Sequence, residues 1–378
     1  MFDKRYQITK PFEFNKENGP FEEIDNKNSQ IKEILGENGI DADFFGFKTK
    51  LPIGVAAGPL YNKNYMKGAA NDGFEVICWK TFRSVARLAH RSNGDFLGHN
   101  IVFIKSDMFD KSKTDNVLKG SLEFNEDKEK VSITNSFGMP STLPSVWMPE
   151  IVDIEKFTEE NNKQTIASVV GTPDENGGIS ELADDYAFCA RMCELSGAKI
   201  IEVNLSCPNV KGKEGSIFKN PKDAALIVKR TKEFFINKNT KLLMKVGYCE
   251  VEEYEELLKE TSPYIDGVVA INTIPMTVVD KEGMQALPGG SKSGICGYPI
   301  LDMAVQAVKN LVQVKEKLNL DLRIFGCGGV TSPEAFMKHI DAGAEFVFVG
   351  TAALFNPELP TQIAKYLAKN NIKRSIIK

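Results

Sequence analysis

The sequence predicts an α/β protein folded as one (β/α)8 TIM barrel. From Leu51 onward, eight short apolar runs alternate with longer amphipathic segments. The short runs are continuously apolar, as expected of strands in a parallel sheet that is covered on both faces. An open doubly wound sheet is the alternative, but it requires a G-x-G-x-x-G turn after the first strand. Gly54 and Gly58 do not give that spacing, so the barrel is favoured.

The predicted strands and helices follow one another in the order that a barrel requires. We expect strands at Ile53–Ala56, Val76–Trp79, Ile166–Val170, Ile200–Val203, Leu242–Lys245, Gly267–Ile271, Ile324–Cys327 and Phe346–Val349. Helical patterns lie at Glu181–Ser196, Lys222–Phe235, Val251–Glu260, Ile300–Leu318 and Ser332–Ala342. The last helix has Thr331 or Ser332 as its N-cap and Pro333 in its first turn.

Two segments fall outside this repeat. Residues 1–50 are polar and rich in Asn and Lys, and we expect them to pack as an N-terminal extension on the barrel of residues 51–370. Residues 85–160 separate the second and third strands by too much for one crossover helix. We expect this insertion, with a β-hairpin, to lie over the carboxyl-terminal mouth of the barrel, where barrel enzymes carry their chemistry.

The composition indicates a soluble, cytoplasmic enzyme with reduced cysteines. Among 378 residues, 47 are basic and 51 are acidic, and this balance argues against a nucleic-acid surface. We find no apolar stretch of 18 residues and no apolar signal core at the N-terminus. The seven cysteines include no C-x-x-C pair and the chain has only three histidines, so we expect no metal site and no iron–sulfur cluster.

Polar side chains gather where the fourth predicted strand ends. Within Ile200–Asn209, the apolar strand gives way to Asn204, Ser206, Cys207 and Asn209. A folding core does not need so much hydrogen-bonding capacity at one strand end. We therefore expect a site there that holds a planar polar ring beside an acid–base group.

Other strand ends add lysines, an amide and small residues to the same mouth. Lys80 and Lys245 follow the second and fifth strands, and a lysine among buried residues requires an anionic partner. Asn272-Thr273 follows the sixth strand. Ala56-Ala57-Gly58, after the first strand, lets a flat ligand approach the backbone.

Glycine-rich turns predict a phosphate site. Gly326-Cys327-Gly328-Gly329 ends the seventh strand and Gly350-Thr351 follows the eighth, each before a helix. Backbone amides and helix dipoles at these two strand ends suit a phosphate. We expect Pro288–Gly297, which includes Gly294, to form a third, flexible loop near the same end.

These residues fit a phosphorylated ring cofactor with a small planar polar substrate. The phosphate could belong to FMN or to a phosphosugar substrate, and the two lysines are equally compatible with Schiff-base aldolase chemistry. No Asp/Glu pair recurs at the predicted strand ends, which disfavours glycoside hydrolysis.

In their order along the chain, these motifs resemble those of the dihydroorotate dehydrogenase family. The matching segments are Lys80-Thr81, Asn135-Ser-Phe-Gly-Met-Pro140, Asn204-Leu-Ser-Cys-Pro-Asn209, Lys245, Asn272-Thr273, Gly326-Cys-Gly-Gly329 and Val349-Gly-Thr351. The resemblance covers roughly residues 51–365. Cys207 stands where the cytosolic class 1 enzymes carry a catalytic cysteine, whereas the membrane-associated class 2 enzymes have serine there.

The resemblance implies an FMN enzyme that oxidises dihydroorotate to orotate for pyrimidine biosynthesis. Cys207 would remove a proton from C5 of the substrate while the C6 hydride passes to the flavin, and Lys80 and Ser206 would complete the catalytic set. The substrate would be bound by Lys80, Asn135, Phe137, Gly138, Met139, Asn204, Asn209, Asn272 and Thr273. FMN would be bound by Ala56, Ala57, Gly58, Lys80, Thr81, Asn204, Lys245, Thr273, Gly294, Cys327, Gly328, Gly329, Gly350 and Thr351.

The chain departs from the family after its second strand. Lys80 is followed by Thr-Phe-Arg-Ser-Val-Ala-Arg rather than by a short Gly/Asn/Pro/Arg segment. Lys80-Thr-Phe also resembles the pyrimidine-reducing domain of dihydropyrimidine dehydrogenase, which acts on uracil and thymine. That domain usually has histidine at the position of Asn209, so the resemblance favours dihydroorotate. A non-catalytic FMN-binding barrel is the third alternative.

The resemblance also implies an electron acceptor and an oligomeric state. We expect a homodimer that uses fumarate as its acceptor, because class 1 enzymes of that type need one polypeptide and one FMN. A quinone, or NAD through an iron–sulfur partner subunit, is also compatible with the sequence.

Overall fold

Eight parallel strands close into a barrel in the order that the sequence predicts. The computed structural model describes residues 4–91, 99–109, 117–124, 127–172, 177–206 and 216–376. The barrel strands are β3 (Ile53–Val55), β4 (Val76–Cys78), β8 (Gln164–Val169), β9 (Ile200–Asn204), β10 (Lys241–Val246), β11 (Gly267–Ala270), β14 (Arg323–Cys327) and β15 (Phe346–Val349). Each strand pairs in parallel with the next, and β15 pairs with β3. The predicted (β/α)8 barrel is therefore confirmed.

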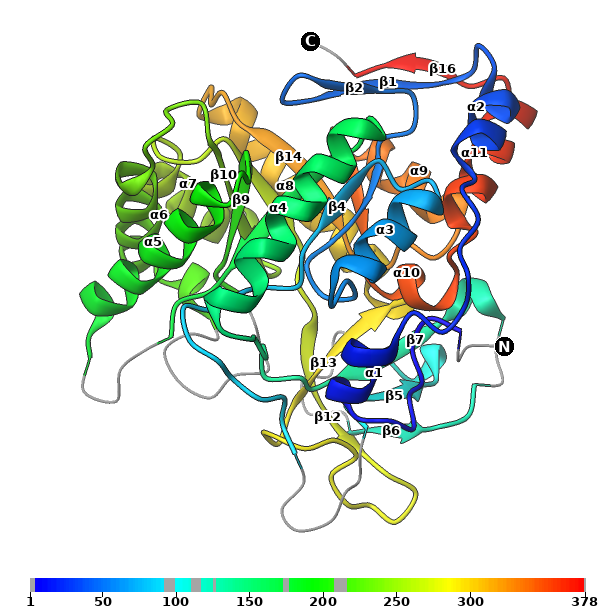
Figure 1. Cartoon of the computed structure of the whole chain (residues 1–378), viewed down its shortest axis with the longest axis horizontal. Helices are drawn as coiled ribbons and strands as arrows, with labels where there is room; N and C mark the ends of the chain where they lie inside the picture. Colours follow the sequence, from blue (N-terminus) through cyan, green and yellow to red (C-terminus); the bar gives the residue numbers. More distant parts are fainter. Residues whose placement is uncertain are drawn as a thin grey trace.

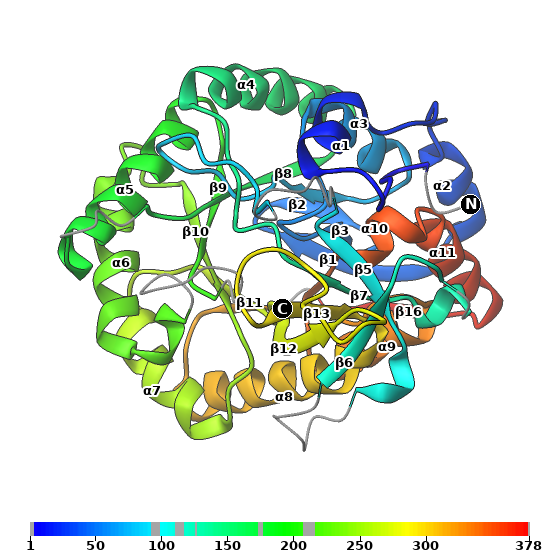
Figure 2. The ribbon, with the colours of Figure 1, turned by 90° about the horizontal axis from the view of Figure 1, so that it is seen from below.

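Helices form a ring around this barrel (Figure 2). They are α3 (Lys63–Asn71), α4 (Pro144–Glu160), α5 (Ile179–Leu195), α6 (Pro221–Phe234), α7 (Val251–Thr261), α8 (Leu301–Lys317), α9 (Pro333–Asp341), α10 (Thr351–Phe355) and α11 (Leu359–Lys369). Short 3₁₀ turns lie at Ser106–Met108, Lys128–Lys130, Ile217–Lys219 and Tyr298–Ile300. The predicted N-cap of α9 is confirmed, because the Ser332 hydroxyl accepts a hydrogen bond from the Ala335 N–H.

A three-stranded sheet covers the amino-terminal end of the barrel (Figure 1). It joins β1 (Gly39–Phe44) and β2 (Phe47–Thr49) to β16 (Lys373–Ser375) near the end of the chain. The buried Phe44 ring packs 5.0 Å from the ring of Phe325 and 5.1 Å from that of Phe346, between ring centroids. Aromatic side chains therefore fill this end of the barrel, which leaves the opposite end for a site.

A second, five-stranded barrel stands at the carboxyl-terminal end of the main barrel. Its strands are β5 (Ile101–Ile104), β6 (Val117–Ser121), β7 (Ser132–Asn135), β12 (Ile274–Val279) and β13 (Ser293–Gly297). The first three belong to the insertion between β4 and β8, and the last two follow β11. The expectation that 288–297 is a flexible loop was wrong for 293–297, since β13 pairs with both β7 and β12 and these ladders hold its backbone.

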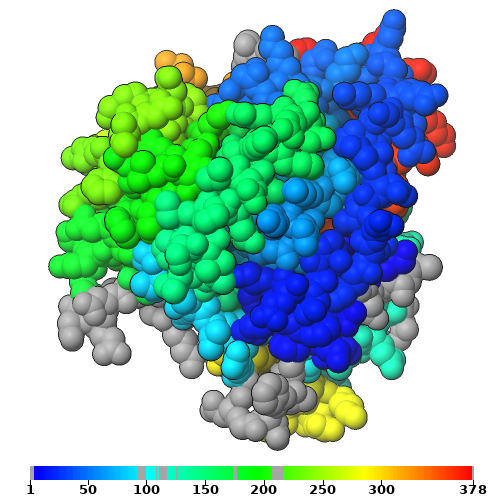
Figure 3. Space-filling model, viewed as in Figure 1, coloured from blue at the N-terminus to red at the C-terminus, as the bar shows by residue number. Residues whose placement is uncertain are grey.

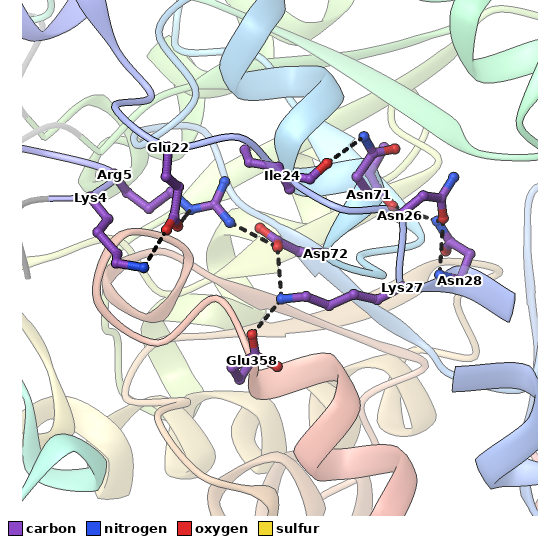
Figure 4. A network of polar contacts seen from close by, with 11 residues as sticks. Lys4, Arg5, Glu22, Ile24, Asn26, Lys27, Asn28, Asn71, Asp72 and Glu358 are labelled. Atoms are coloured by element: carbon purple, nitrogen blue, oxygen red, sulfur yellow. Dashed lines mark hydrogen bonds and ion pairs between the residues drawn. The ribbon is translucent and has the colours of Figure 1, made fainter. Parts of the chain in front are cut away.

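The N-terminal segment runs along one side of the molecule between the two ends of the barrel (Figure 3). It contains α1 (Phe12–Asn18) and α2 (Asn28–Leu35). A chain of ion pairs fastens it to the barrel (Figure 4), and Asp72, at the end of α3, receives Arg5 at 2.9 Å and Lys27 at 3.3 Å. Lys27 also reaches Glu358, just before α11.

None of the helices in the described ranges has the length and apolarity to cross a bilayer.

Candidate active site

A cavity opens between the carboxyl ends of the barrel strands and the second barrel. It encloses about 1030 Å³ of empty space, counting the part that is open to solvent. The following sequence-predicted residues line it: Ala56, Ala57, Gly58, Lys80, Thr81, Asn135, Phe137, Gly138, Met139, Asn204, Lys245, Asn272, Thr273, Cys327, Gly328, Gly329, Gly350 and Thr351. The fold thus brings together side chains that stand almost 300 positions apart in the sequence, from Ala56 to Thr351.

Lys245 is a buried cation in the wall of this cavity. It is the last residue but one of β10, it is only 3 % exposed, and its Nζ lies 3.3 Å from the Sγ of Cys327 on β14. Burial alone would lower the pKa of Lys245, but the neighbouring Cys327 and the Glu202 carboxylate outweigh it, so the pKa is raised. The ammonium group therefore stays protonated and offers a positive charge to an anionic ligand.

Lys80 stands on another side of the cavity, among aromatic rings. It follows β4, and its Nζ lies 4.6 Å from the centroid of the Phe137 ring and 5.7 Å from that of Tyr61. Cations are attracted to ring faces at such distances. Tyr61 lines the cavity but was not predicted from the sequence, although it follows the first barrel strand by only a few positions.

Amide side chains at two strand ends are joined by hydrogen bonds. The Nδ2 of Asn272 donates to the Oδ1 of Asn204 at 3.2 Å and to the hydroxyl of Ser206 at 3.2 Å. The Nδ2 of Asn204 in turn donates to the Thr81 hydroxyl at 3.3 Å. These contacts fix the orientation of the two amides before a ligand binds.

The loop after β7 forms the side of the cavity that the second barrel supports. The Nδ2 of Asn135 donates to the Sγ of Cys296 at 3.4 Å and to the carbonyl oxygen of Gly294 at 3.5 Å. Cys296 lines the cavity and was not predicted. Gly138 has a φ of +74°, and a Cβ there would lie 2.4 Å from the Nε2 of His90, so this turn requires glycine.

The glycine turns predicted to receive a phosphate border the same cavity. Gly329 has a φ of +74°, and a Cβ there would lie 2.3 Å from the Cα of Leu301. A Cβ at Gly350 would meet no atom within 4 Å, so the backbone there faces open space. Nearby, the buried Thr273 hydroxyl has no hydrogen-bond partner among the described residues, which is expected where a ligand supplies one.

Four predicted residues are not among those that line the cavity in the described part of the chain. Ser206 is buried behind the cavity wall, where its hydroxyl donates to the Lys245 carbonyl oxygen at 3.2 Å. Gly294 lies on β13 and contributes its carbonyl oxygen to Asn135, as described above. Cys207 and Asn209 fall outside the described residues.

A comparison of the sequence with known protein families finds one match. The family profile for dihydroorotate dehydrogenase matches residues 122–370, more than half of the chain. The chain belongs to the dihydroorotate dehydrogenase family. A relative from Dictyostelium discoideum named dihydroorotate dehydrogenase is 31 % identical over 365 residues, which cover 93 % of this chain and 94 % of that protein.

Other members of the dihydroorotate dehydrogenase family differ in the acceptor that their names give. The catalytic subunit of a dihydroorotate dehydrogenase B (NAD(+)) from Desulforudis audaxviator is 30 % identical over 51 % of this chain and 62 % of that protein. A protein from Streptococcus uberis, provisionally named dihydroorotate dehydrogenase A (fumarate), is 28 % identical over 64 % of this chain and 73 % of its own length.

Proposed function

We propose that this protein is an FMN-dependent dihydroorotate dehydrogenase that oxidises dihydroorotate to orotate in pyrimidine biosynthesis. The observation that carries the proposal is the convergence of two lysines, three amides and two glycine turns on one cavity. Family membership supports the reaction, and the cavity supplies the groups that the reaction needs.

The residues present fit FMN. The turns at Gly328–Gly329 and at Gly350 would hold its phosphate, and the unpartnered Thr273 hydroxyl would bind its polar atoms. Lys245 would lie beside the isoalloxazine ring, where a cation favours the reduced, anionic form. When bound, FMN supplies the hydride acceptor.

The amides and Lys80 would bind the substrate. Asn135, Asn204 and Asn272 present donors and acceptors that match the edges of a pyrimidine ring. Lys80 would neutralise the carboxylate of dihydroorotate, a group that dihydrouracil lacks. We assign the role of general base to Cys207, which follows Ser206 directly in the sequence. A thiol has an ordinary pKa near 8.5, so the surroundings of Cys207 have to lower its pKa or the pH optimum has to be alkaline.

The proposed acceptor is fumarate, and the proposed assembly is a cytoplasmic homodimer. Fumarate is a small dicarboxylate, and one of its carboxylates can take the place of orotate's carboxylate, so the same polar cavity and Lys80 would accept it after orotate leaves. The relatives carry both NAD and fumarate names, so support for fumarate comes from the chemistry of the cavity.

The test is turnover by the purified chain. We expect flavin absorbance in the purified protein and orotate formation from dihydroorotate with fumarate as the sole acceptor. Colourless protein that takes up no added FMN would refute the proposal. Turnover with NAD alone, or only with an added second subunit, would refute the fumarate assignment and leave the FMN enzyme intact.

A further inference from the structure

We propose that Phe12, from the N-terminal segment, is a positioning residue that holds the Lys80 ammonium group in the active site. This inference rests on the proposed function, in which Lys80 contacts the substrate. It extends the site to a segment that lies far outside the main barrel in the sequence, and it gives that segment, through Phe12, a role in the reaction.

Three aromatic rings surround the Lys80 ammonium group. The Nζ lies 5.5 Å from the ring centroid of Phe12, in addition to the contacts with Phe137 and Tyr61. The rings also contact one another: Phe12 stands perpendicular to Tyr61 at 5.1 Å and edge-on to Phe137 at 5.5 Å, between centroids. Such edge-to-face contacts fix the rings as a unit, which we call the aromatic cage.

Phe12 acts from behind the cavity wall. Its side chain is 4 % exposed, and the residues that line the cavity include Lys80, Tyr61 and Phe137 but not Phe12. Any effect of Phe12 on a bound substrate therefore has to pass through one of the residues that it contacts. Of the three cavity residues named above that contact Phe12, Lys80 is the charged one, so we infer that the Phe12 ring constrains the position of its ammonium group.

The backbone of Phe12 is fixed to the loop that carries Phe137. The Phe12 N–H donates to the side-chain oxygen of Asn100 at 3.3 Å. The Nδ2 of Asn100 donates to the Ser136 carbonyl oxygen at 3.0 Å and to the His90 carbonyl oxygen at 2.9 Å. The buried side chain of Asn100 thus links the first residue of α1 to the residue before Phe137. These hydrogen bonds fix the positions of Phe12 and Phe137 relative to each other.

The rest of the N-terminal segment is fastened to α3. The Tyr65 hydroxyl donates to the Arg5 carbonyl oxygen at 2.7 Å, and the Arg5 guanidinium pairs with Asp72. The same hydroxyl lies 3.2 Å from the carbonyl oxygen of Asn15 in α1, so these buried contacts (Figure 4 shows the ion pairs) hold α1 and the chain before it against the barrel without a bound ligand. The Phe12 ring is therefore preorganised, which is what a group that orients a catalytic lysine requires.

The chain offers a matched control on the same helix. Phe14 also lies near a lysine, with the Nζ of Lys10 5.6 Å from its ring centroid, and it stacks on Phe21. This pair lies outside the cavity lining. Phe14→Leu therefore removes an aromatic ring and a cation–π contact from α1 without touching the aromatic cage.

The first measurement is a double-mutant cycle on anaerobic flavin reduction by dihydroorotate. Phe12→Leu keeps an apolar side chain but removes the ring, and we expect it to slow reduction by about 3- to 10-fold. Phe14→Leu should leave the rate unchanged. In a Lys80→Met background, Phe12→Leu should change the residual rate by less than about 2-fold, because its partner is gone. An unchanged rate in Phe12→Leu, or the same slowing in both backgrounds, would overturn the proposal.

The second measurement does not depend on activity. The full-length protein, without substrate, is treated with acetic anhydride, and acetylation of Lys80 is followed by peptide mass spectrometry relative to Lys10. We expect Phe12→Leu to speed acetylation of Lys80 by about 2-fold or more, since one wall of the cage is lost. Equal acetylation in wild type and Phe12→Leu would overturn the proposal. If dihydroorotate fails to reduce the wild-type flavin, the proposed function fails, while acetylation still decides whether the cage exists.

Discussion

The Nζ of Lys245 lies 3.3 Å from the Sγ of Cys327, so a buried lysine at the end of β10 faces a thiol at the end of β14. Both residues line the cavity. This contact places a permanent positive charge next to the glycine turn of residues 328–329. Retention of flavin should therefore depend on Lys245 more than on Lys241, the other lysine of the same strand.

We predict that Lys245→Met lowers the flavin content of the purified protein to a small fraction of the wild-type value. The reason is that an anionic ring loses its buried cation. The measurement is the ratio of flavin to protein absorbance. Lys241→Met is the control, because Lys241 begins β10 and pairs with Asp266 at 3.2 Å, away from the cavity lining. Normal flavin content in Lys245→Met would contradict the assignment of Lys245.

Cys207→Ala should abolish dihydroorotate oxidation and leave the flavin bound. Loss of a general base typically slows a reaction by about 10²- to 10⁴-fold. Cys207→Ser should retain weak activity that increases with pH, because a hydroxyl is the poorer base. Stopped-flow flavin reduction across a pH series is the measurement, with Cys249→Ala as a buried-thiol control. Near-normal reduction by Cys207→Ala at neutral pH would rule out this role.

Asn272→Ala should raise the KM for dihydroorotate by about 10-fold or more, because it removes a ligand donor and frees the amide of Asn204. Flavin content should change little. The measurement is the KM for dihydroorotate from steady-state kinetics of the purified variant. Asn237→Ala, on an exposed loop, serves as the control. An unchanged KM would show that the Asn204–Asn272 pair does not contact the substrate.

Glu155→Gln should stabilise the protein at alkaline pH. Burial raises the pKa of Glu155 to about 7 from an ordinary value of 4.5, against the opposing effects of Thr165 and Lys199. Below pH 4.5 the carboxyl is protonated in both states. Between these two values only the folded state keeps its proton, so the free energy of unfolding falls as the pH rises. Above pH 7 the ionised Glu155 carboxylate lowers the free energy of unfolding by on the order of 3 kcal/mol.

Thermal unfolding at pH 4.5 and pH 8 tests this prediction. Glu155→Gln should raise the melting temperature at pH 8 and leave it nearly unchanged at pH 4.5. The control is Glu159→Gln, since Glu159 is exposed and pairs with Lys199 on the surface. Equal effects of Glu155→Gln at both pH values would argue against a raised pKa.

The main barrel could be predicted because each of its strands carries its own signal. Val347 and its neighbours in β15, for example, are apolar on both faces, and a helix follows at once. The second barrel could not be predicted in the same way. Its strand β6 is mostly exposed, so it has no continuous apolar run. It pairs with β12, which lies far along the chain, and a local sequence pattern does not predict such a pairing.

The residues of the candidate site likewise include some that the sequence predicts and some that it does not. Lys80, Asn204 and Lys245 could be predicted because each lies at or just after the carboxyl end of a strand, and all these ends meet at one mouth of a parallel barrel. Phe12 could not, since it lies in a polar segment and reaches Lys80 only through tertiary packing. Cys296 was missed because Pro288–Gly297 was interpreted as a loop, whereas a strand places its side chain at the cavity.

The most direct test of the proposed function is anaerobic mixing of the flavin-loaded protein with dihydroorotate or with dihydrouracil, followed by flavin absorbance. We predict that dihydroorotate bleaches the flavin and that dihydrouracil, which lacks the carboxylate, does not. Reduction by dihydrouracil alone would place the chemistry with uracil and thymine, and reduction by neither would contradict the proposed activity.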